Sequence, residues 1–267
     1  KNISALLPQL IGGSADLSGS NNTKSNNSKI INSKNFDGNY IHYGVREHGM
    51  AAVMNGLALY GGLIPYGGTF LIFSDYCKPS IRLSALMGLK VIYIFSHDSI
   101  GLGEDGPTHQ PIEQLTGLRA IPNLNVFRPA DINETLECLE IALKSCNTPS
   151  AITLSRQKVP YINPKNSKEN KCEKGAYVVK ITSHESNVTI IASGTEVELA
   201  LKTQEKLKEN NIHSKVVSMP CMELFDKQPE EFRNDIIEPH SLVITLEAGS
   251  IISWQKYVKN KGMNIGI

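Results

Sequence analysis

The chain has 267 residues and a formal net charge of +1, so it is long enough for one large or two medium domains. A charge so close to zero gives no electrostatic case for nucleic acid or a membrane surface as a partner, and no apolar run is long enough to span a bilayer. Five cysteines are scattered without CxxC or zinc spacing, which indicates reduced thiols and predicts a cytoplasmic location.

The first chemically suggestive stretch is SADLSGS, which follows the short apolar segment LPQLIGG. Its glycine, its serines and Asp16 predict a strand that ends in a loop. Ser20 either presents its hydroxyl to an anion such as phosphate or is an ordinary turn serine. Residues 21–37 are rich in Asn, Lys and Ser, and this composition predicts an exposed loop.

A helix is predicted after a short strand at residues 40–43, because apolar side chains recur with the spacing of one helix face: Met50, Val53, Met54 and Leu57. Met50 and Met54 are expected to be core residues. Glu47 stands on the same face, at the start of the helix. It either favours the helix dipole there or lies buried with a raised pKa, able to share a proton with a ligand nitrogen.

Three aromatic residues, Phe70, Phe73 and Tyr76, are spaced three apart around a predicted strand-to-helix transition. Such a trio usually belongs to the core. The preceding GGT, at residues 67–69, supports an alternative in which the aromatic rings line a gap where a flat ring stacks.

The stretch richest in reactive side chains is HDSIGLGEDGPTHQPIE, residues 97–113, which follows the apolar run VIYIF. It combines two histidines and four carboxylates with glycines and prolines that exclude a long helix. Open α/β sheets keep their sites in loops at the carboxyl ends of strands, although an ordinary solvated loop has a similar composition.

The remaining elements alternate between strands and helices. A helix with a capping box, Asp131 and Glu134, is followed by the strand SAITLS and Arg156, which is either a phosphate or carboxylate clamp or part of a surface ion pair. A polar linker is predicted at residues 161–174, and a second capping box, Thr195 and Glu198, starts a later helix. The predicted fold class is α/β, with two domains that each contain a largely parallel sheet flanked by helices. No cluster of chemically active residues stands out in the second domain.

Several motifs along the chain occur together in one protein family. The stretch HDSIGLGEDGPTHQP resembles the signature loop of the transketolase family. GGSADLSGSN, VREHGMAAVMNG, YGGTFLIFSDY and LSRQKVP resemble the other blocks of that family, in the same order. The resemblance implies a thiamine-diphosphate-binding fold followed by a transketolase C-terminal domain.

The resemblance also implies an activity and a set of site residues. The family uses thiamine diphosphate to transfer a two-carbon ketol unit from a ketose phosphate, such as xylulose 5-phosphate, to an aldose phosphate, such as ribose 5-phosphate, in the pentose phosphate pathway of carbohydrate metabolism. By resemblance, Glu47 is the catalytic residue that hydrogen-bonds the aminopyrimidine ring, and the cofactor-binding residues are Phe70, Phe73, Tyr76 and Asp16. By resemblance, His97 and Asp105 hydrogen-bond sugar hydroxyls, and the phosphate end is held by Ser20, His109 and Arg156.

The family's diphosphate-binding N-terminal domain has no counterpart in this sequence. The ligands of its Mg²⁺ or Ca²⁺ lie on that domain, so none is expected here. We therefore expect an excerpt of a longer protein: a pyrimidine-binding (middle) domain at 1–162 and a truncated C-terminal domain at 175–267. Such a chain is expected to be inactive by itself, and in the family a second subunit of a homodimer completes each site.

Three alternatives stay open. Deoxyxylulose-phosphate synthase shares a GEDGPTH-type block, although HDSIG favours transketolase. Dihydroxyacetone synthase is distinguished by its preference for formaldehyde as acceptor. The alternative from another class is a non-catalytic fragment, or a split subunit that needs a partner chain, and the length of the parent reading frame separates it from one continuous enzyme.

Overall fold

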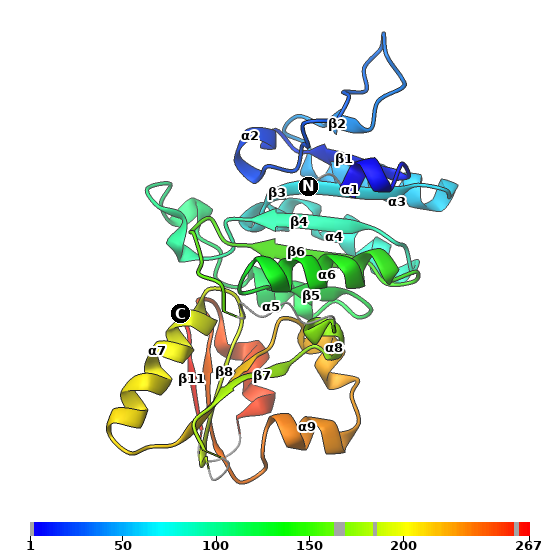
Figure 1. Cartoon of the computed structure of the whole chain (residues 1–267). Coiled ribbons are helices and arrows are strands. Elements are labelled where there is room, and N and C mark those ends of the chain that lie inside the picture. Colours follow the sequence, from blue (N-terminus) through cyan, green and yellow to red (C-terminus); the bar gives the residue numbers. More distant parts are fainter. Residues whose placement is uncertain (1–2, 163–168, 184–185, 259–261) are drawn as a thin grey trace. The chain divides into compact units, whose positions relative to one another are not determined.

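The computed structural model describes residues 3–162, 169–183, 186–258 and 262–267 (Figure 1). Contacts divide the chain into two compact units. The first comprises Lys1–Gln110, Ala120–Leu124 and Ala142–Arg156, and the second comprises Pro111–Arg119, Asn125–Ile141 and Gln157–Ile267. The linker predicted at residues 161–174 lies partly outside the described residues, at 163–168. Among the residues that are described, no helix is long and apolar enough to cross a bilayer.

The first unit is built on a parallel sheet. Five of its strands lie in the order β2-β1-β3-β4-β6, and each pairs in parallel with its neighbour. Their bounds are β1 Leu10–Ser14, β2 Tyr40–His42, β3 Ile64–Phe70, β4 Ile92–Ser96 and β6 Ser150–Leu154. Because β1 is followed in sequence by β2 on one side and is paired with β3 on the other, the strand order reverses at the β1–β3 boundary. Open parallel sheets bind ligands at such a switch point.

The first unit contains two long helices, α3 (Glu47–Tyr60) and α4 (Ser74–Leu86), and several short helical segments. The short segments are the helices α1 (Ile3–Leu6) and α2 (Ser18–Asn21) and the 3₁₀ turns η1 (Leu71–Phe73), η2 (Ile100–Leu102) and η3 (Pro107–His109). Helices α3 and α4 pack against each other, and α3 also packs on β3. A Cβ atom on Gly67 of β3 would stand only 2.4 Å from the sulfur of Met54 and 2.9 Å from that of Met50. Both methionines are fully buried, so their predicted place in the core is confirmed.

The predicted apolar face of α3 is only partly correct. Val53 is 45 % exposed, whereas Asn55 is buried. The amide of Asn55 donates to the carbonyl of Ser80 at 2.9 Å and accepts from the hydroxyl of Ser84 at 2.6 Å. A polar side chain with these partners can be buried without penalty, so the buried face of α3 is turned away from Val53.

The Asn-rich loop also departs from the prediction at its start. Asn21 is buried at the end of α2 rather than exposed, because its amide donates to the hydroxyl of Ser14 at 2.9 Å and accepts from that of Thr23 at 2.8 Å. The rest of the segment at 22–37 is mostly exposed or half-buried and is irregular, as predicted.

The second unit contains a five-stranded sheet in the order β11-β10-β8-β9-β7, parallel except that β7 runs antiparallel to β9. Its strands are β7 Tyr177–Ile181, β8 Val188–Ala192, β9 Ser214–Ser218, β10 Leu242–Leu246 and β11 Met263–Ile265. The other elements are α5 Gln114–Arg119, β5 Asn125–Phe127, α6 Ile132–Lys144, η4 Lys171–Lys174, α7 Glu196–Glu209, α8 Met222–Asp226, α9 Glu230–Ile236 and η5 Ile251–Tyr257, with the end of α6 belonging to the first unit. Two largely parallel sheets with helices confirm the predicted fold class.

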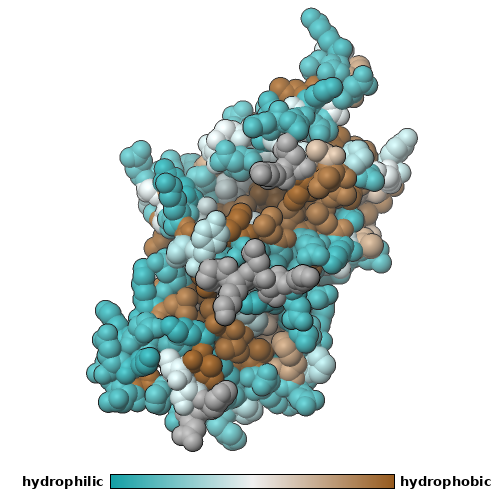
Figure 2. Space-filling view, in the orientation of Figure 1, coloured by the Kyte–Doolittle hydropathy of each residue, from teal (hydrophilic) through white to brown (hydrophobic). Residues whose placement is uncertain are grey.

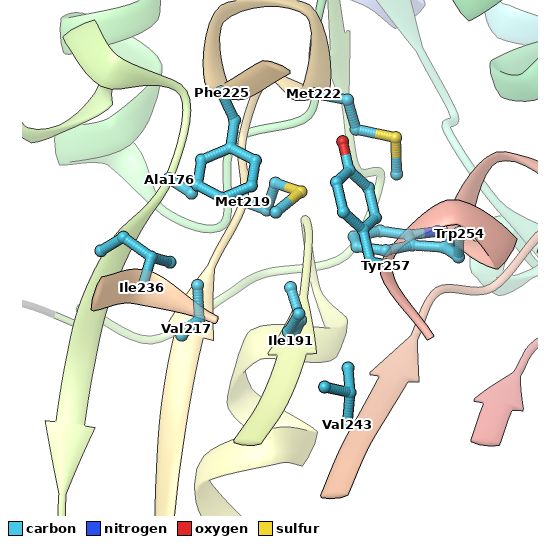
Figure 3. Packing of buried hydrophobic residues seen from close by; sticks show 10 residues of the cluster. All are labelled: Ala176, Ile191, Val217, Met219, Met222, Phe225, Ile236, Val243, Trp254 and Tyr257. Carbon is cyan, nitrogen blue, oxygen red and sulfur yellow. The ribbon is translucent and has the colours of Figure 1, made fainter. Parts of the chain in front are cut away.

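The core of the second unit has a cluster of apolar and aromatic side chains around Met219, Phe225 and Trp254 (Figure 3). Trp254, the only tryptophan of the chain, is 1 % exposed and belongs to this cluster. Helix α7 buries Val197 and Ala200 on its inner face, and its outward side is covered largely by hydrophilic atoms (Figure 2, lower left).

Only one of the two predicted capping boxes forms. At the start of α6, the amide of Glu134 donates to the carboxylate of Asp131 at 2.9 Å, and the side chain of Glu134 reaches back to the amide of Ala130 at 2.7 Å. At the start of α7, Thr195 already has helical backbone angles and makes no capping bond. Its hydroxyl donates instead to Glu196 at 2.6 Å, so the second capping box is wrong.

Candidate active site

The predicted site residues collect at one edge of the first sheet. Asp16 follows β1, Phe70 ends β3, His97 follows β4 directly, and Arg156 comes two residues after β6. These four strands are neighbours and run parallel, so their carboxyl ends lie side by side at spacings of about 4.8 Å. The loop after β4 lies beside the arrowheads of β4 and β6 (Figure 1, left). Parallel pairing therefore brings together residues that are far apart in the sequence.

The aromatic trio forms a ladder of rings. Phe70 and Phe73 stack with centroids 5.8 Å apart and planes 6° apart, and Phe73 stacks on Tyr76 at 5.8 Å and 23°. The first ring is buried, the second is half-buried, and Tyr76 is 64 % exposed. A purely structural trio would be buried throughout. The ladder instead runs from the core to an open surface on which a flat ring can stack.

Both histidines of the signature loop touch this ladder. The ring of His97 stacks on Phe70 with centroids 3.7 Å apart, and His109 meets Phe73 edge-on at 5.4 Å. His97 has a positive φ of 59°, a conformation that is uncommon for a residue other than glycine and that marks many functional sites. Its Nδ1 atom lies 3.0 Å from the hydroxyl of Ser96, which fixes the orientation of the ring.

The electrostatics of His97 show which charged groups surround it. Burial is the main cause that lowers its pKa, and the positive charge of Arg156 and the nearby His109 lower it further, whereas Asp105 opposes them. The imidazole is therefore neutral at neutral pH and can exchange hydrogen bonds with a hydroxyl group. Arg156 is exposed, and a Cβ atom on Gly103 would lie 3.6 Å from its guanidinium. The loop and the end of β6 thus share one patch of surface.

Glu47 is the buried acid of the site. It is the first residue of α3 and is 8 % exposed, on the same side of the helix as Met50. Features of both alternatives left by the sequence are present, since Glu47 is buried and also stands in the first turn of α3, where a carboxylate favours the helix dipole. Burial and, second, the charge of Glu47 raise the pKa of Cys77 to about 12. The thiol of Cys77 lies 3.8 Å from the carbonyl oxygen of Phe73. The charge of Glu47 therefore affects a thiol that contacts the backbone of the aromatic ladder.

Asp16 and Ser20 reach the same edge from β1 and are both exposed. Asp16 has a positive φ of 61°, and Ser20 lies on α2. Among the described residues, the ring contacts that join the aromatic residues to the histidines leave out five predicted site residues: Asp16, Ser20, Glu47, Asp105 and Arg156. Asp105 is exposed and, like Arg156, acts on His97 through its charge. The supporting roles of Asn21 and Ser96 were missed, because a single asparagine in a polar loop and a serine next to a histidine form no distinctive sequence pattern.

No group of three or more His, Cys, Asp or Glu side chains within the described ranges is arranged to hold a metal ion. The carboxyl edge presents stacked rings, the buried carboxyl group of Glu47 and the exposed guanidinium of Arg156.

Comparison with known proteins agrees with this arrangement. Residues 2–161 match the model of the transketolase pyrimidine-binding domain, and residues 175–267 match that of the transketolase-like C-terminal domain. The chain belongs to the transketolase family. The resemblance expected from the motifs is thereby confirmed.

Individual relatives support the assignment to the transketolase family. A transketolase from Sinorhizobium medicae is 54 % identical over 258 residues, which cover 96 % of this chain and 37 % of that protein. A transketolase from Pichia stipitis, solved in complex with sedoheptulose 7-phosphate, superposes with a TM-score of 0.94 at 40 % identity, over 99 % of this chain and 39 % of that one. The chain thus spans less than two fifths of the length of these relatives.

One solved relative is matched over most of its own length. It is described as a split-gene transketolase in an inactive β4 tetramer, and it superposes with a TM-score of 0.78 at 26 % identity. The match covers 99 % of this chain and 84 % of that one. A transketolase half of this size therefore exists as a separate chain in at least one member of the family.

Proposed function

We propose that this chain supplies the pyrimidine-binding side of a transketolase active site, which transfers a two-carbon ketol unit from a ketose phosphate to an aldose phosphate. The observation that carries the proposal is the aromatic ladder, which is open at Tyr76, touched by His97 and His109, and flanked by the buried Glu47.

The side chains at this edge fit the aminopyrimidine end of thiamine diphosphate. A flat heteroaromatic ring can stack at the open end of the ladder, where Phe73 is half-buried and Tyr76 is exposed. A buried carboxylate such as Glu47 can hold a hydrogen bond to a ring nitrogen and stabilise the tautomer that bears a proton there. When bound, the cofactor supplies the carbanion chemistry. Asp16 is proposed to lie near the same ring.

The loop residues are proposed to orient the sugar. His97 is neutral and fixed by Ser96, so it can hydrogen-bond a hydroxyl of the donor, and Asp105 can read the configuration of a neighbouring hydroxyl. Arg156 is exposed beside the loop, where a guanidinium can bind a phosphate through two parallel hydrogen bonds. His109 and Ser20 are proposed to complete the phosphate site.

The rest of the machinery is proposed to lie on other chains or domains. Mg²⁺ or Ca²⁺ and the diphosphate would be held by a diphosphate-binding domain, and a second subunit of a homodimer would complete each site. The proposed domain boundaries stay at 1–162 and 175–267. The proposed compartment is the cytoplasm, since all five cysteines are free thiols, as a reducing compartment keeps them.

A second candidate is favoured by one observation. The split-gene relative shows that a chain of about this extent can be a subunit of its own. In that case this chain is a β-type subunit that needs a separately encoded partner. Its side of the chemistry is the same, and only the origin of the diphosphate-binding part differs.

Ketol transfer from xylulose 5-phosphate to ribose 5-phosphate tests the proposal, with thiamine diphosphate and magnesium present. The chain is assayed alone and then mixed with a separately produced N-terminal diphosphate-binding domain of a close relative. We expect no turnover by the chain alone and turnover in the mixture. Binding of the two parts without any turnover would contradict the proposed activity. Sequencing the parent reading frame then distinguishes a split subunit from a continuous enzyme.

A further inference from the structure

The residues that follow the signature loop belong to the second unit. The first continuous part of the first unit ends at Gln110, one residue before the end of the signature loop (residues 97–111), and the next segment, Pro111–Arg119, belongs to the second unit. We call Pro111–Arg119 the exit segment. His109 is only two residues before it, so whatever fixes the exit segment also fixes one end of the loop that carries His97, Asp105 and His109.

Three hydrogen bonds tie Ile112 and Thr116 of the exit segment to residues 247–254, here called the brace. The amide of Ser250 donates to the carbonyl of Ile112 at 2.8 Å. The hydroxyl of Thr116 donates to the carbonyl of Ser250 at 3.3 Å, and that of Ser253 donates to the hydroxyl of Thr116 at 2.9 Å. Close approach is needed here, since a Cβ atom on Gly249 would lie 3.1 Å from the carbonyl oxygen of Ile112.

A buried ion pair fixes the far end of the exit segment. The guanidinium of Arg119 donates two bonds of 2.7 Å to the carboxylate of Glu247, and the two side chains are 5 % and 1 % exposed. The same carboxylate accepts from Ser193 at 2.6 Å and from the indole of Trp254 at 2.8 Å. A bidentate ion pair whose carboxylate accepts two further hydrogen bonds holds both side chains in a single geometry.

Both members of this pair are charged at physiological pH. Burial on its own raises the pKa of Glu247, but the charge of Arg119, its hydrogen bonds and the charge of Arg128 outweigh it and lower the pKa to about 2. Glu247 therefore stays ionised throughout the physiological range, and the ion pair persists with it.

The signature loop needs such an anchor. It leaves β4 at Ser96, where the sheet holds it, but it contains only short 3₁₀ turns and the positive-φ glycines Gly103 and Gly106. Hydrogen bonds that hold the exit segment also restrict the backbone of the residues next to it, which include His109. We propose that the brace, through Glu247, Ser250 and Ser253, positions the signature loop for the proposed reaction. This role rests on the proposed function only in what the loop binds.

Hydrogen–deuterium exchange of the whole chain tests the brace without any need for activity. Thr116→Val removes the hydroxyl that joins Ser250 to Ser253 and keeps the shape of the side chain. Thr203→Val is the matched control, because that hydroxyl donates to the carbonyl of Leu199 at 2.9 Å on the exposed side of α7 in the same unit. We expect exchange at residues 98–110 to quicken about threefold to tenfold in Thr116→Val and not in Thr203→Val, with β8 unchanged in both.

Two results would overturn the proposal: unchanged loop exchange in Thr116→Val, or equal acceleration in both variants, which would indicate general loosening. Glu247→Gln provides a stronger perturbation of the same brace, and the conservative Thr116→Ser should restore slow exchange. In an assembled, active enzyme, Thr116→Val should raise KM for the ketose phosphate and leave kcat nearly unchanged. Since exchange is measured without substrate, failure of the proposed function would leave the exchange result intact.

Discussion

We expect the carboxyl group of Glu134 to make the stability of the second unit depend on pH. It lies fully buried in the first turn of α6, and it accepts bonds from Ser218 at 2.6 Å, Ala130 at 2.7 Å and Tyr177 at 2.8 Å. Burial raises its pKa from 4.5 to about 7, against the lowering effect of these three bonds and with a small contribution from Asp131. The perturbation is Glu134→Gln, which keeps the size of the side chain and removes its titration.

The sign follows from proton binding. Between pH 4.5 and 7 the folded chain holds a proton on Glu134 that the unfolded chain has lost, so the free energy of unfolding falls as the pH rises. At about 1.36 kcal/mol per pH unit, the loss reaches about 3 kcal/mol once the buried group has ionised. Below pH 4.5 both states are protonated, and above pH 7 both are ionised, so the dependence levels off at each end.

Urea unfolding monitored by the fluorescence of Trp254 reports on this unit, because the indole is buried in the core of the second unit, to which Glu134 also belongs. We expect the difference in unfolding free energy, wild type minus Glu134→Gln, to fall by about 3 kcal/mol between pH 4.5 and 8. Glu198→Gln is the control, since that carboxylate lies in a partly exposed pair with Lys202. A difference that rises with pH would refute the reasoning, because it would mean that the three donors outweigh burial.

Three further predictions concern the first unit. Arg156→Ala in an assembled enzyme should raise KM for a phosphorylated donor about tenfold to a hundredfold with kcat nearly unchanged, and a pure loss of kcat in steady-state kinetics would count against the phosphate role. Phe73→Ala should weaken binding of thiamine diphosphate about threefold to tenfold in a fluorescence titration, whereas unchanged affinity would exclude stacking on the ladder. Met54→Ala should lower the free energy of unfolding by about 2–5 kcal/mol in urea titrations followed by circular dichroism, and a loss below about 1 kcal/mol would show that the contact with Gly67 is not tightly packed.

Local patterns in the sequence predicted the parts of the fold that depend on local chemistry. The spacing of Phe70, Phe73 and Tyr76 matched a strand-to-helix transition, and the glycines and prolines after His97 marked an irregular loop at the end of a strand. Both features depend on side chains that lie within a few residues of one another. The burial of Met50 and Met54 followed from helical periodicity for the same reason.

Features set by distant partners could not be predicted. Asn55 is buried because of Ser80 and Ser84, which lie 25 and 29 residues away in the chain, so an apolar pattern placed the buried face too near Val53. Arg119 binds Glu247 across 128 residues, and this pair helps to assign the exit segment to the second unit. No spacing rule connects such pairs, because only tertiary folding brings them together.

The site was predicted unevenly for the same reason. Parallel pairing of β4 with β6 explains why the charge of Arg156 acts on His97 although 59 positions separate them. The sequence suggested each of these residues only as the end of its own strand. The supports of the site, such as Ser96 beside His97, carry no signal of their own in the sequence. The resemblance of the motifs to a family, rather than periodicity, suggested that these residues act together.

The pyrimidine-binding role proposed for Glu47 and the aromatic ladder in a ketol-transferring site can be tested by activity. Its most direct test is the rate of sedoheptulose 7-phosphate formation from xylulose 5-phosphate and ribose 5-phosphate by the chain mixed with a diphosphate-binding domain. Wild type is compared with Glu47→Ala and with Asp37→Ala, a control at an exposed carboxylate of the Asn-rich loop. We predict turnover for wild type and Asp37→Ala, and a loss of about two to four orders of magnitude for Glu47→Ala with unchanged circular dichroism. Turnover by Glu47→Ala close to that of wild type would contradict the account.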